Sequence, residues 1–240
     1  MTESTFPTEV IDLPSKGLLY PKDNPLSSGK VEMKYMSAKE EDILTNQSYI
    51  QKGTVLDKLL ESLIVNKDIK VRDLIVGDKN ALLIAARILG YGKEYMFTYK
   101  GEEQEVDLSL LENKPFDESL ITKGVNEFAF TLPSSGTNIT FKILNGEDEN
   151  NIDREIEGLK KINKNISPEL TTRLKYIITS VNGSREKKDI RDFIDNHLLA
   201  RDSRELRQYI KSVQPDVNMT ITTNSGAEVT MPVSLNFFWP

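Results

Sequence analysis

Three groups of residues in this sequence have types and spacings that could support chemistry. Gly90-Tyr91-Gly92-Lys93 superficially resembles a phosphate-binding loop, residues 147–149 form a carboxylate cluster, and His197 is the only histidine. A phosphate-binding loop needs a longer glycine-rich turn that joins a strand to a Lys-Ser/Thr helix start. Here the glycines follow a helical pattern, so they are expected to end a helix instead.

Acid–base catalysis would need carboxylates or a histidine with a shifted pKa in a cleft. The acidic residues at 102–107 and 147–149 fall in expected turns or exposed strand faces, and His197 lies near an expected helix C-terminus, where the helix dipole favours a cation. A Ser/His triad is not indicated, because there is one histidine and no Gly-x-Ser-x-Gly motif. The absence of cysteine excludes disulfides, thiolate metal ligands and a cysteine nucleophile. We therefore expect no enzyme activity, no catalytic residues, no cofactor and no metal.

Charge and composition narrow the class of partner. The 240 residues carry a formal net charge of −6, which argues against nucleic-acid binding. Residues 183–212 are rich in basic side chains, but interleaved carboxylates are typical of a solvated, salt-bridged helix face. No apolar run approaches the roughly 20 residues of a membrane span, and the N-terminus has no secretory pattern. These features predict a protein of the cytoplasm.

Runs of helical and strand patterns alternate along the chain in blocks, which predicts an α+β fold. Residues 1–36 are expected to form an extended, proline-rich arm and a first strand, and 37–94 a helical part. Residues 95–146 read as β-hairpins and 147–213 as an inserted helical part. Residues 214–240 form a C-terminal hairpin and an aromatic tail, expected to pack with 95–146.

Local signals give the boundaries of several elements. Ser37-Ala38-Lys39-Glu40 is a capping box, and Asp202-Ser203-Arg204-Glu205 is predicted to be another. Asp78 is expected to cap a buried helix over 80–89, and the acidic residues 145–151 to break the chain before a helix. Ser167-Pro168-Glu169 is expected to start a helix that runs to Val181.

The two ends of the chain are unusually apolar, and two interpretations stay open for them. They either fold back on the protein's own core or anchor a partner, since buried aromatics contribute a few kcal/mol (about 1.5–3 each) in both settings. On the second interpretation, the residues that bind partners are Leu13, Pro14, Leu18, Leu19, Tyr20, Pro21, Phe237, Phe238, Trp239 and Pro240.

The same residues carry a family resemblance. The blocks Leu13-Pro14-Ser15-Lys16-Gly17-Leu18-Leu19-Tyr20-Pro21 and Gly29-Lys30-Val31-Glu32-Met33-Lys34-Tyr35-Met36 resemble the baseplate hub and hub-assembly proteins of T-even-like contractile-tailed bacteriophages. Shorter matches occur at 38–44, 57–60, 74–78, 85–92 and 235–240. The long N-terminal block is specific, whereas no short piece would be specific alone.

This resemblance implies a non-enzymatic component of the tail hub that acts by protein–protein contacts in baseplate assembly. The alternative is a transient chaperone for the tape-measure protein or hub intermediates, absent from the mature virion. The partners would be other tail or hub proteins, the tape-measure protein, or further copies of this chain. The location would be the host cytoplasm during assembly and, for a structural subunit, the tail baseplate.

The resemblance also concerns the hairpin turns. Some relatives carry Cys-x-x-Cys-Gly pairs, resembling zinc ribbons, where this chain has Phe97-x-x-Lys100-Gly101 and Thr222-x-x-Ser225-Gly226. One hypothesis is a metal-free ribbon that joins the middle and C-terminal hairpins by side-chain packing. The other is a pair of ordinary hairpins with glycine turns.

Overall fold

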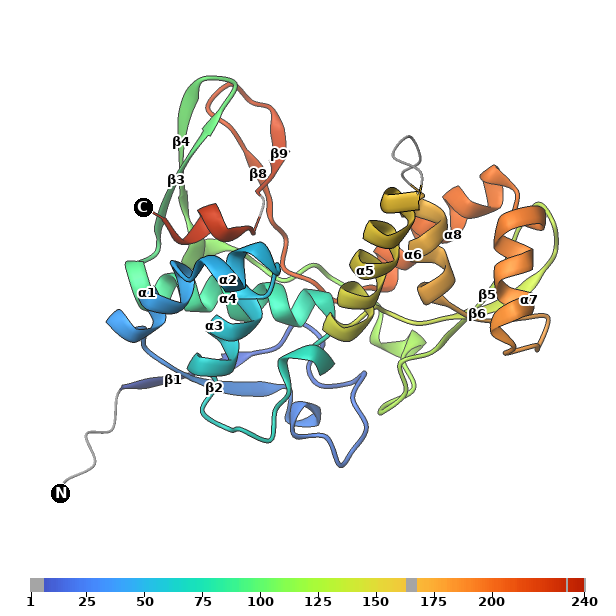
Figure 1. Ribbon diagram of the computed structural model, residues 1–240, viewed down its shortest axis with the longest axis horizontal. Coiled ribbons are helices and arrows are strands. Elements are labelled where there is room, and N and C mark those ends of the chain that lie inside the picture. The colour runs from blue at the N-terminus through green and yellow to red at the C-terminus, as the bar shows by residue number, and fades with distance from the viewer. Residues whose placement is uncertain (1–6, 163–167, 232, 240) are drawn as a thin grey trace. The chain divides into compact units, whose positions relative to one another are not determined.

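The computed structural model describes residues 7–162, 168–231 and 233–239, and the chain divides into two compact units (Figure 1). Unit 1 contains the chain up to Gly17, then Lys22–Pro115, and the segment from Pro215 onward. Unit 2 contains Leu18–Pro21 and Phe116–Gln214. Helices and small antiparallel sheets occur in separate runs, so the expected α+β class is confirmed.

Among its described residues, unit 1 combines three two-stranded antiparallel sheets with four α-helices. The sheets pair β1 with β2, β3 with β4, and β8 with β9. The elements are β1 (Thr8–Asp12), β2 (Lys30–Lys34), α1 (Ala38–Leu44), α2 (Gln47–Gln51), α3 (Val55–Leu63), α4 (Val76–Tyr91), β3 (Glu94–Tyr99), β4 (Glu102–Asp107), β8 (Thr220–Thr222) and β9 (Glu228–Thr230). Short 3-10 helices lie at Pro25–Ser28, Val71–Asp73, Leu108–Leu110 and Leu235–Phe238.

Helix α1 begins with the predicted capping box. The Ser37 backbone N–H donates to a carboxylate oxygen of Glu40 at 2.9 Å, and the Ser37 hydroxyl donates to the same oxygen at 2.6 Å. The Glu40 side chain is fully buried and also accepts from Lys34 and Ser62. Burial alone would raise the pKa of Glu40, but these hydrogen bonds together lower it to about 2.

The buried helix α4 differs from its prediction at both ends. It begins at Val76 rather than Asn80, and it continues through Gly90 to Tyr91. The Asp78 carboxylate accepts from the Ser15 backbone N–H at 2.9 Å and from the Ser15 hydroxyl at 2.6 Å. The sequence predicts that Asp78 caps a helix. In the structure, Asp78 instead fixes the N-terminal segment.

The N-terminal segment, expected as an extended arm, is folded onto unit 1. Strand β1 pairs with β2, and the Leu13 N–H donates to the Gly29 carbonyl at 2.8 Å. Gly17 has a φ of +75°, and a Cβ there would lie 2.6 Å from the backbone of Gly29. The loop between β1 and β2 thus closes by a backbone contact that only glycine allows.

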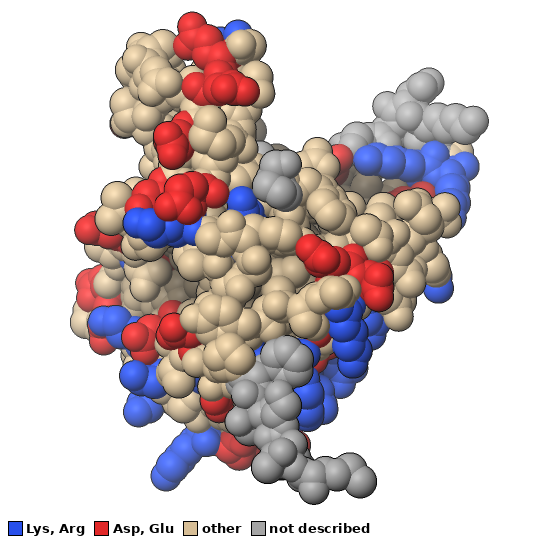
Figure 2. Space-filling view, turned by 90° about the vertical axis from the view of Figure 1, so that its left-hand side faces the viewer, with Lys and Arg blue, Asp and Glu red and all other residues tan. Residues whose placement is uncertain are grey.

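The predicted first and last hairpins are both present, and they lie against each other in unit 1. Asn224 lies in the turn between β8 and β9, and its backbone N–H donates to the side-chain oxygen of Gln104 in β4 at 2.8 Å. Lys100 and Gly101 both have positive φ, as tight hairpin turns require. Figure 2 shows acidic side chains gathered on these hairpins, where Glu94, Glu103 and Glu105 are exposed.

The described part of unit 2 contains one three-stranded antiparallel sheet, β5–β6–β7, and four α-helices. The elements are β5 (Phe128–Thr131), β6 (Asn138–Phe141), α5 (Gly146–Ile162), α6 (Glu169–Ile177), β7 (Ile178–Val181), α7 (Lys187–Asp192) and α8 (Ala200–Val213), with a 3-10 helix at Glu118–Leu120 and a π-helix at Phe193–His197. The block predicted as 95–146 is therefore divided, since β3–β4 belongs to unit 1 and β5–β6 to unit 2.

Three predictions in unit 2 are wrong. Within the acidic segment 145–151, residues 146–151 are the first part of α5 rather than a break, because carboxylates are favourable at a helix N-terminus. Residues 178–181 form β7 rather than the end of a helix, since they pair with β6. Asp202 accepts from the backbone N–H groups of Ser134 and Ser135, at 2.7 and 3.0 Å, instead of opening α8. The predicted cap Ser167 lies outside the described residues.

Candidate functional sites: the apolar ends and a basic pocket

The apolar residues near the N-terminus lie mostly inside the protein. Leu13, Pro14, Leu19 and Tyr20 are buried, Leu18 is half-buried, and only Pro21 of this predicted set is exposed. Leu18 accepts a backbone hydrogen bond from Gly124 within unit 2 at 2.8 Å. These residues therefore form part of the protein's own interior.

The aromatic C-terminal segment is also internal. Phe237 and Phe238 are fully buried, Trp239 is 40% exposed, and Pro240 lies outside the described residues. The Phe237 ring meets the Tyr95 ring edge-on, with centroids 4.8 Å apart, and packs against Phe238 at 5.6 Å. The chain thus supplies its own apolar environment for two of the three aromatic residues.

A buried arginine holds the C-terminal segment in place. Arg87, in α4, is 2% exposed, and its guanidinium donates to the carbonyls of Phe237, Gly92 and Glu94 at 3.1, 3.0 and 3.3 Å. Burial lowers the pKa of Arg87 below its ordinary value. Three carbonyl acceptors and the nearby Tyr91 ring take the place of water around this charge.

For the buried residues, these positions correct the partner-anchor interpretation and favour the other one, in which the apolar ends fold back on the protein's own core. Leu13, Pro14, Phe237 and Phe238 are buried residues of unit 1, and Leu19 and Tyr20 are buried residues of unit 2. Pro21 and Trp239 alone keep substantial exposure among the described members of the predicted set.

Residues that carry the family resemblance contact one another in unit 1. Besides the contacts of Ser15 with Asp78 and of Arg87 with Phe237, a Cβ at Gly90 would lie 2.5 Å from the Met36 sulfur. Sequence blocks far apart in the chain thus build one framework. These contacts join the blocks to one another within unit 1.

The outer edge of β1 is a free sheet edge. Leu13 donates to Gly29 and Tyr35 donates to Pro7, so alternate residues of β1 direct their backbone groups toward β2. The N–H and C=O groups of Thr8, Val10 and Asp12 therefore point away from β2, and within the described residues no backbone bond satisfies them. Val10 is 58% exposed at the centre of this edge.

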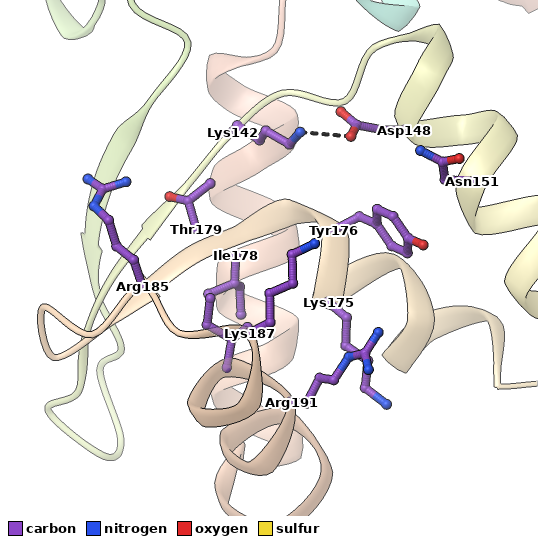
Figure 3. Close-up of a pocket in the computed structure, with 11 residues that line it drawn as sticks. Lys142, Asp148, Asn151, Lys175, Tyr176, Ile178, Thr179, Arg185, Lys187 and Arg191 are labelled. Atoms are coloured by element: carbon purple, nitrogen blue, oxygen red, sulfur yellow. Dashed lines mark hydrogen bonds and ion pairs between the residues drawn. The ribbon is translucent and has the colours of Figure 1, made fainter.

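A pocket of about 470 Å³ lies in unit 2, between the sheet and three of its helices (Figure 3). Helix α7 contributes Lys187, Ile190 and Arg191, and α6 contributes Lys175 and Tyr176. The remaining lining residues come from the sheet, its adjoining turns and α5: Lys142, Asp148, Asn151, Ile178, Thr179 and Arg185. Five cationic side chains and one carboxylate thus share the pocket wall, which we call the basic pocket.

Three of the five cations have a carboxylate partner. Lys142 binds Asp148 at 2.7 Å, and Lys175 binds Asp195 at 2.8 Å. Arg185 binds both carboxylate oxygens of Glu127, each at 2.8 Å. Lys187 and Arg191 have no ion pair with any residue that the structure describes.

The carboxylates and histidine considered in the sequence form no metal-binding group within the described ranges, where no three His, Asp or Glu side chains converge. His197 lies 3.4 Å from Asp192, and both side chains are mostly exposed. No described helix has the length and apolar character needed to cross a bilayer.

Comparison of the chain with protein-family profiles, curated proteins and solved structures gives no match. The family resemblance therefore rests on the sequence blocks themselves.

Sequence reasoning missed the basic pocket. The alternating charges of residues 183–212 predict a solvated helix face, but Lys187 and Arg191 are four residues apart and share one side of α7. That spacing was the available signal. The contributions of Lys142, which follows β6, and of Lys175 in α6 could not be recognised, because these segments reach the pocket only through the tertiary fold.

Proposed function

We propose that this protein is a non-enzymatic component of a contractile-tail baseplate hub that acts by protein–protein contacts during baseplate assembly. The single observation that carries the proposal is the N-terminal block at 13–21 and 29–36, which resembles that family. The contacts of this block support an architectural role. Ser15, Gly17 and Gly29 hold the segment against α4 and against itself, rather than presenting a catalytic group.

The free edge of β1 is the contact surface that fits this function best. It lies directly before the N-terminal block, and its backbone donors and acceptors at Thr8, Val10 and Asp12 have no backbone partner among the residues that the structure describes. A strand of a neighbouring hub protein could extend the β1–β2 sheet by adding along this edge. This assignment replaces the buried ends as the site of assembly contact.

The paired hairpins of unit 1 support the proposal of a metal-free ribbon. The β3–β4 and β8–β9 hairpins keep glycine turns, and Gln104 and Asn224 join them by a hydrogen bond. Tyr95 beside Phe237 supplies apolar packing at their base. Elemental analysis of purified protein should find no stoichiometric zinc, whereas one zinc per chain would contradict this part of the proposal.

A transient assembly chaperone is the alternative function, and quantitative mass spectrometry separates the two. A hub subunit is expected in purified tails at a fixed ratio to the other baseplate proteins. A chaperone is expected in infected lysate and in assembly intermediates but not in purified tails. Absence from both tails and intermediates would overturn the proposal in either form.

A further inference from the structure

The basic pocket has a charge imbalance that a hub role does not use. Unit 2 has equal numbers of acidic and basic residues, so the entire net charge of −6 belongs to unit 1. Within this balanced unit, the pocket wall nevertheless contains five cations and one carboxylate. The ion pairs of Lys142, Lys175 and Arg185 leave Lys187 and Arg191 uncompensated among the described residues.

The two uncompensated cations are close neighbours. Lys187 and Arg191 are four residues apart in α7, a spacing at which like charges on a helix face repel each other. Both line the same hollow, and Figure 3 shows them extending from α7 beside α6. Concave walls of one charge sign concentrate the electric field, so an anion inside the pocket would be attracted more strongly than one on a convex surface.

We propose that the basic pocket of unit 2 binds a small polyanion that carries at least two phosphate groups. The planar guanidinium of Arg191 can donate to two oxygens of one phosphate, and the ammonium group of Lys187 can neutralise a second. Lys142 can add a further donor, because its ion pair with Asp148 lies on the wall of the same hollow.

The size and lining of the pocket favour a small molecule over a macromolecule. Its volume of about 470 Å³ lies within the range of about 300–1,000 Å³ that is usual for small-molecule sites. The buried side chains of Ile178 and Ile190 form apolar parts of its wall. A nucleic-acid strand would need a basic surface that continues beyond the pocket, whereas the neighbouring carboxylates Asp189 and Asp192 interrupt it.

The proposal can be tested by isothermal titration calorimetry of the full chain at constant ionic strength. The probes are sodium pyrophosphate and sodium tripolyphosphate, with orthophosphate, citrate, a short oligothymidine and a Glu-rich peptide as comparison ligands. We expect one saturable site per chain, with tripolyphosphate binding at least about tenfold more tightly than orthophosphate, because each added phosphate gains charge-assisted hydrogen bonds.

Charge-neutralising variants provide the matched comparison. The double variant Lys187→Gln/Arg191→Gln should weaken tripolyphosphate binding by about 10–100-fold. Lys188→Gln removes the same kind of charge from the same helix but lies outside the pocket wall, so its affinity should stay within about twofold of the parent. Circular dichroism of each variant verifies that unit 2 remains folded.

Four results would overturn the proposal. These are the absence of saturable binding of either polyphosphate, an equal loss of affinity in Lys188→Gln, tighter binding of citrate or the Glu-rich peptide than of tripolyphosphate, and tighter binding of oligothymidine. Failure here would leave the hub function intact, since that function rests on unit 1.

Discussion

Replacing Phe237 by alanine separates a core role for the C-terminal segment from a docking role. Phe237 is fully buried, it contacts the rings of Tyr95 and Phe238, and its carbonyl accepts from Arg87. If the segment is core, Phe237→Ala should destabilise unit 1 in the isolated protein. If the segment is instead a partner anchor, the isolated protein should be unaffected.

The expected loss follows from the burial of the ring. An aromatic side chain buries about 150–250 Å², which at about 25 cal/mol per Å² gives an upper value of about 4–6 kcal/mol. Alanine retains part of that area, and Phe→Ala changes in protein cores cost about 3–5 kcal/mol. We therefore expect Phe237→Ala to lower the free energy of unfolding of unit 1 by about 3–5 kcal/mol.

Urea titration followed by tryptophan fluorescence is a suitable assay, because Trp239 is the only tryptophan and lies two residues from the mutated position. Leu110→Ala is the matched control, since Leu110 is an apolar residue of unit 1 that is 75% exposed, and it should cost less than about 0.5 kcal/mol. Phe237→Leu, expected to lose roughly half as much as Phe237→Ala, provides a measurement if the alanine variant does not fold. A Phe237→Ala variant as stable as the parent would refute the reasoning.

Three further perturbations test other parts of the structure. The free energy of unfolding should fall as the pH drops from about 4.5 toward 2, because the Glu40 carboxylate, whose pKa is lowered in the folded state, stabilises that state only while it is ionised. In acid titrations, Glu40→Gln should show less of this fall, and a variant profile identical to that of the parent would contradict the role of Glu40. Gly77→Ala should prevent normal folding of unit 1, because the added Cβ would lie 2.0 Å from the Pro215 carbonyl oxygen. Gly158→Ala in α5 places its Cβ in open space and should stabilise unit 2 by up to about 1 kcal/mol, so thermal melts of the two variants should shift in opposite directions. Val10→Pro removes an N–H of β1 that points away from β2, so it should change the free energy of unfolding by less than about 1 kcal/mol. The variant should nevertheless be incorporated into tails less than the parent protein, and normal incorporation would exclude the β1 edge as the contact surface.

Elements with local signals could be predicted from the sequence. The capping box at Ser37 and the glycine turn of the first hairpin each act within a few residues, and both are present. The α+β class followed from the order of such segments.

The remaining features depend on contacts between distant residues. Asp78 and Asp202 had the sequence context of helix caps, but Ser15 and the Ser134–Ser135 turn compete for their carboxylates in the folded chain. The short segment Ile178–Val181 becomes a strand because β6 is beside it. Whether Phe237 was core or surface could not be decided from composition, since either environment favours an aromatic side chain.

The central claim, that this chain acts in baseplate assembly through protein contacts, is tested most directly by removing its gene from the phage and counting complete tails by electron microscopy. The account predicts that complete baseplates disappear and that the wild-type chain, supplied from a plasmid, restores them. Normal numbers of complete, contractile tails without the protein would contradict it.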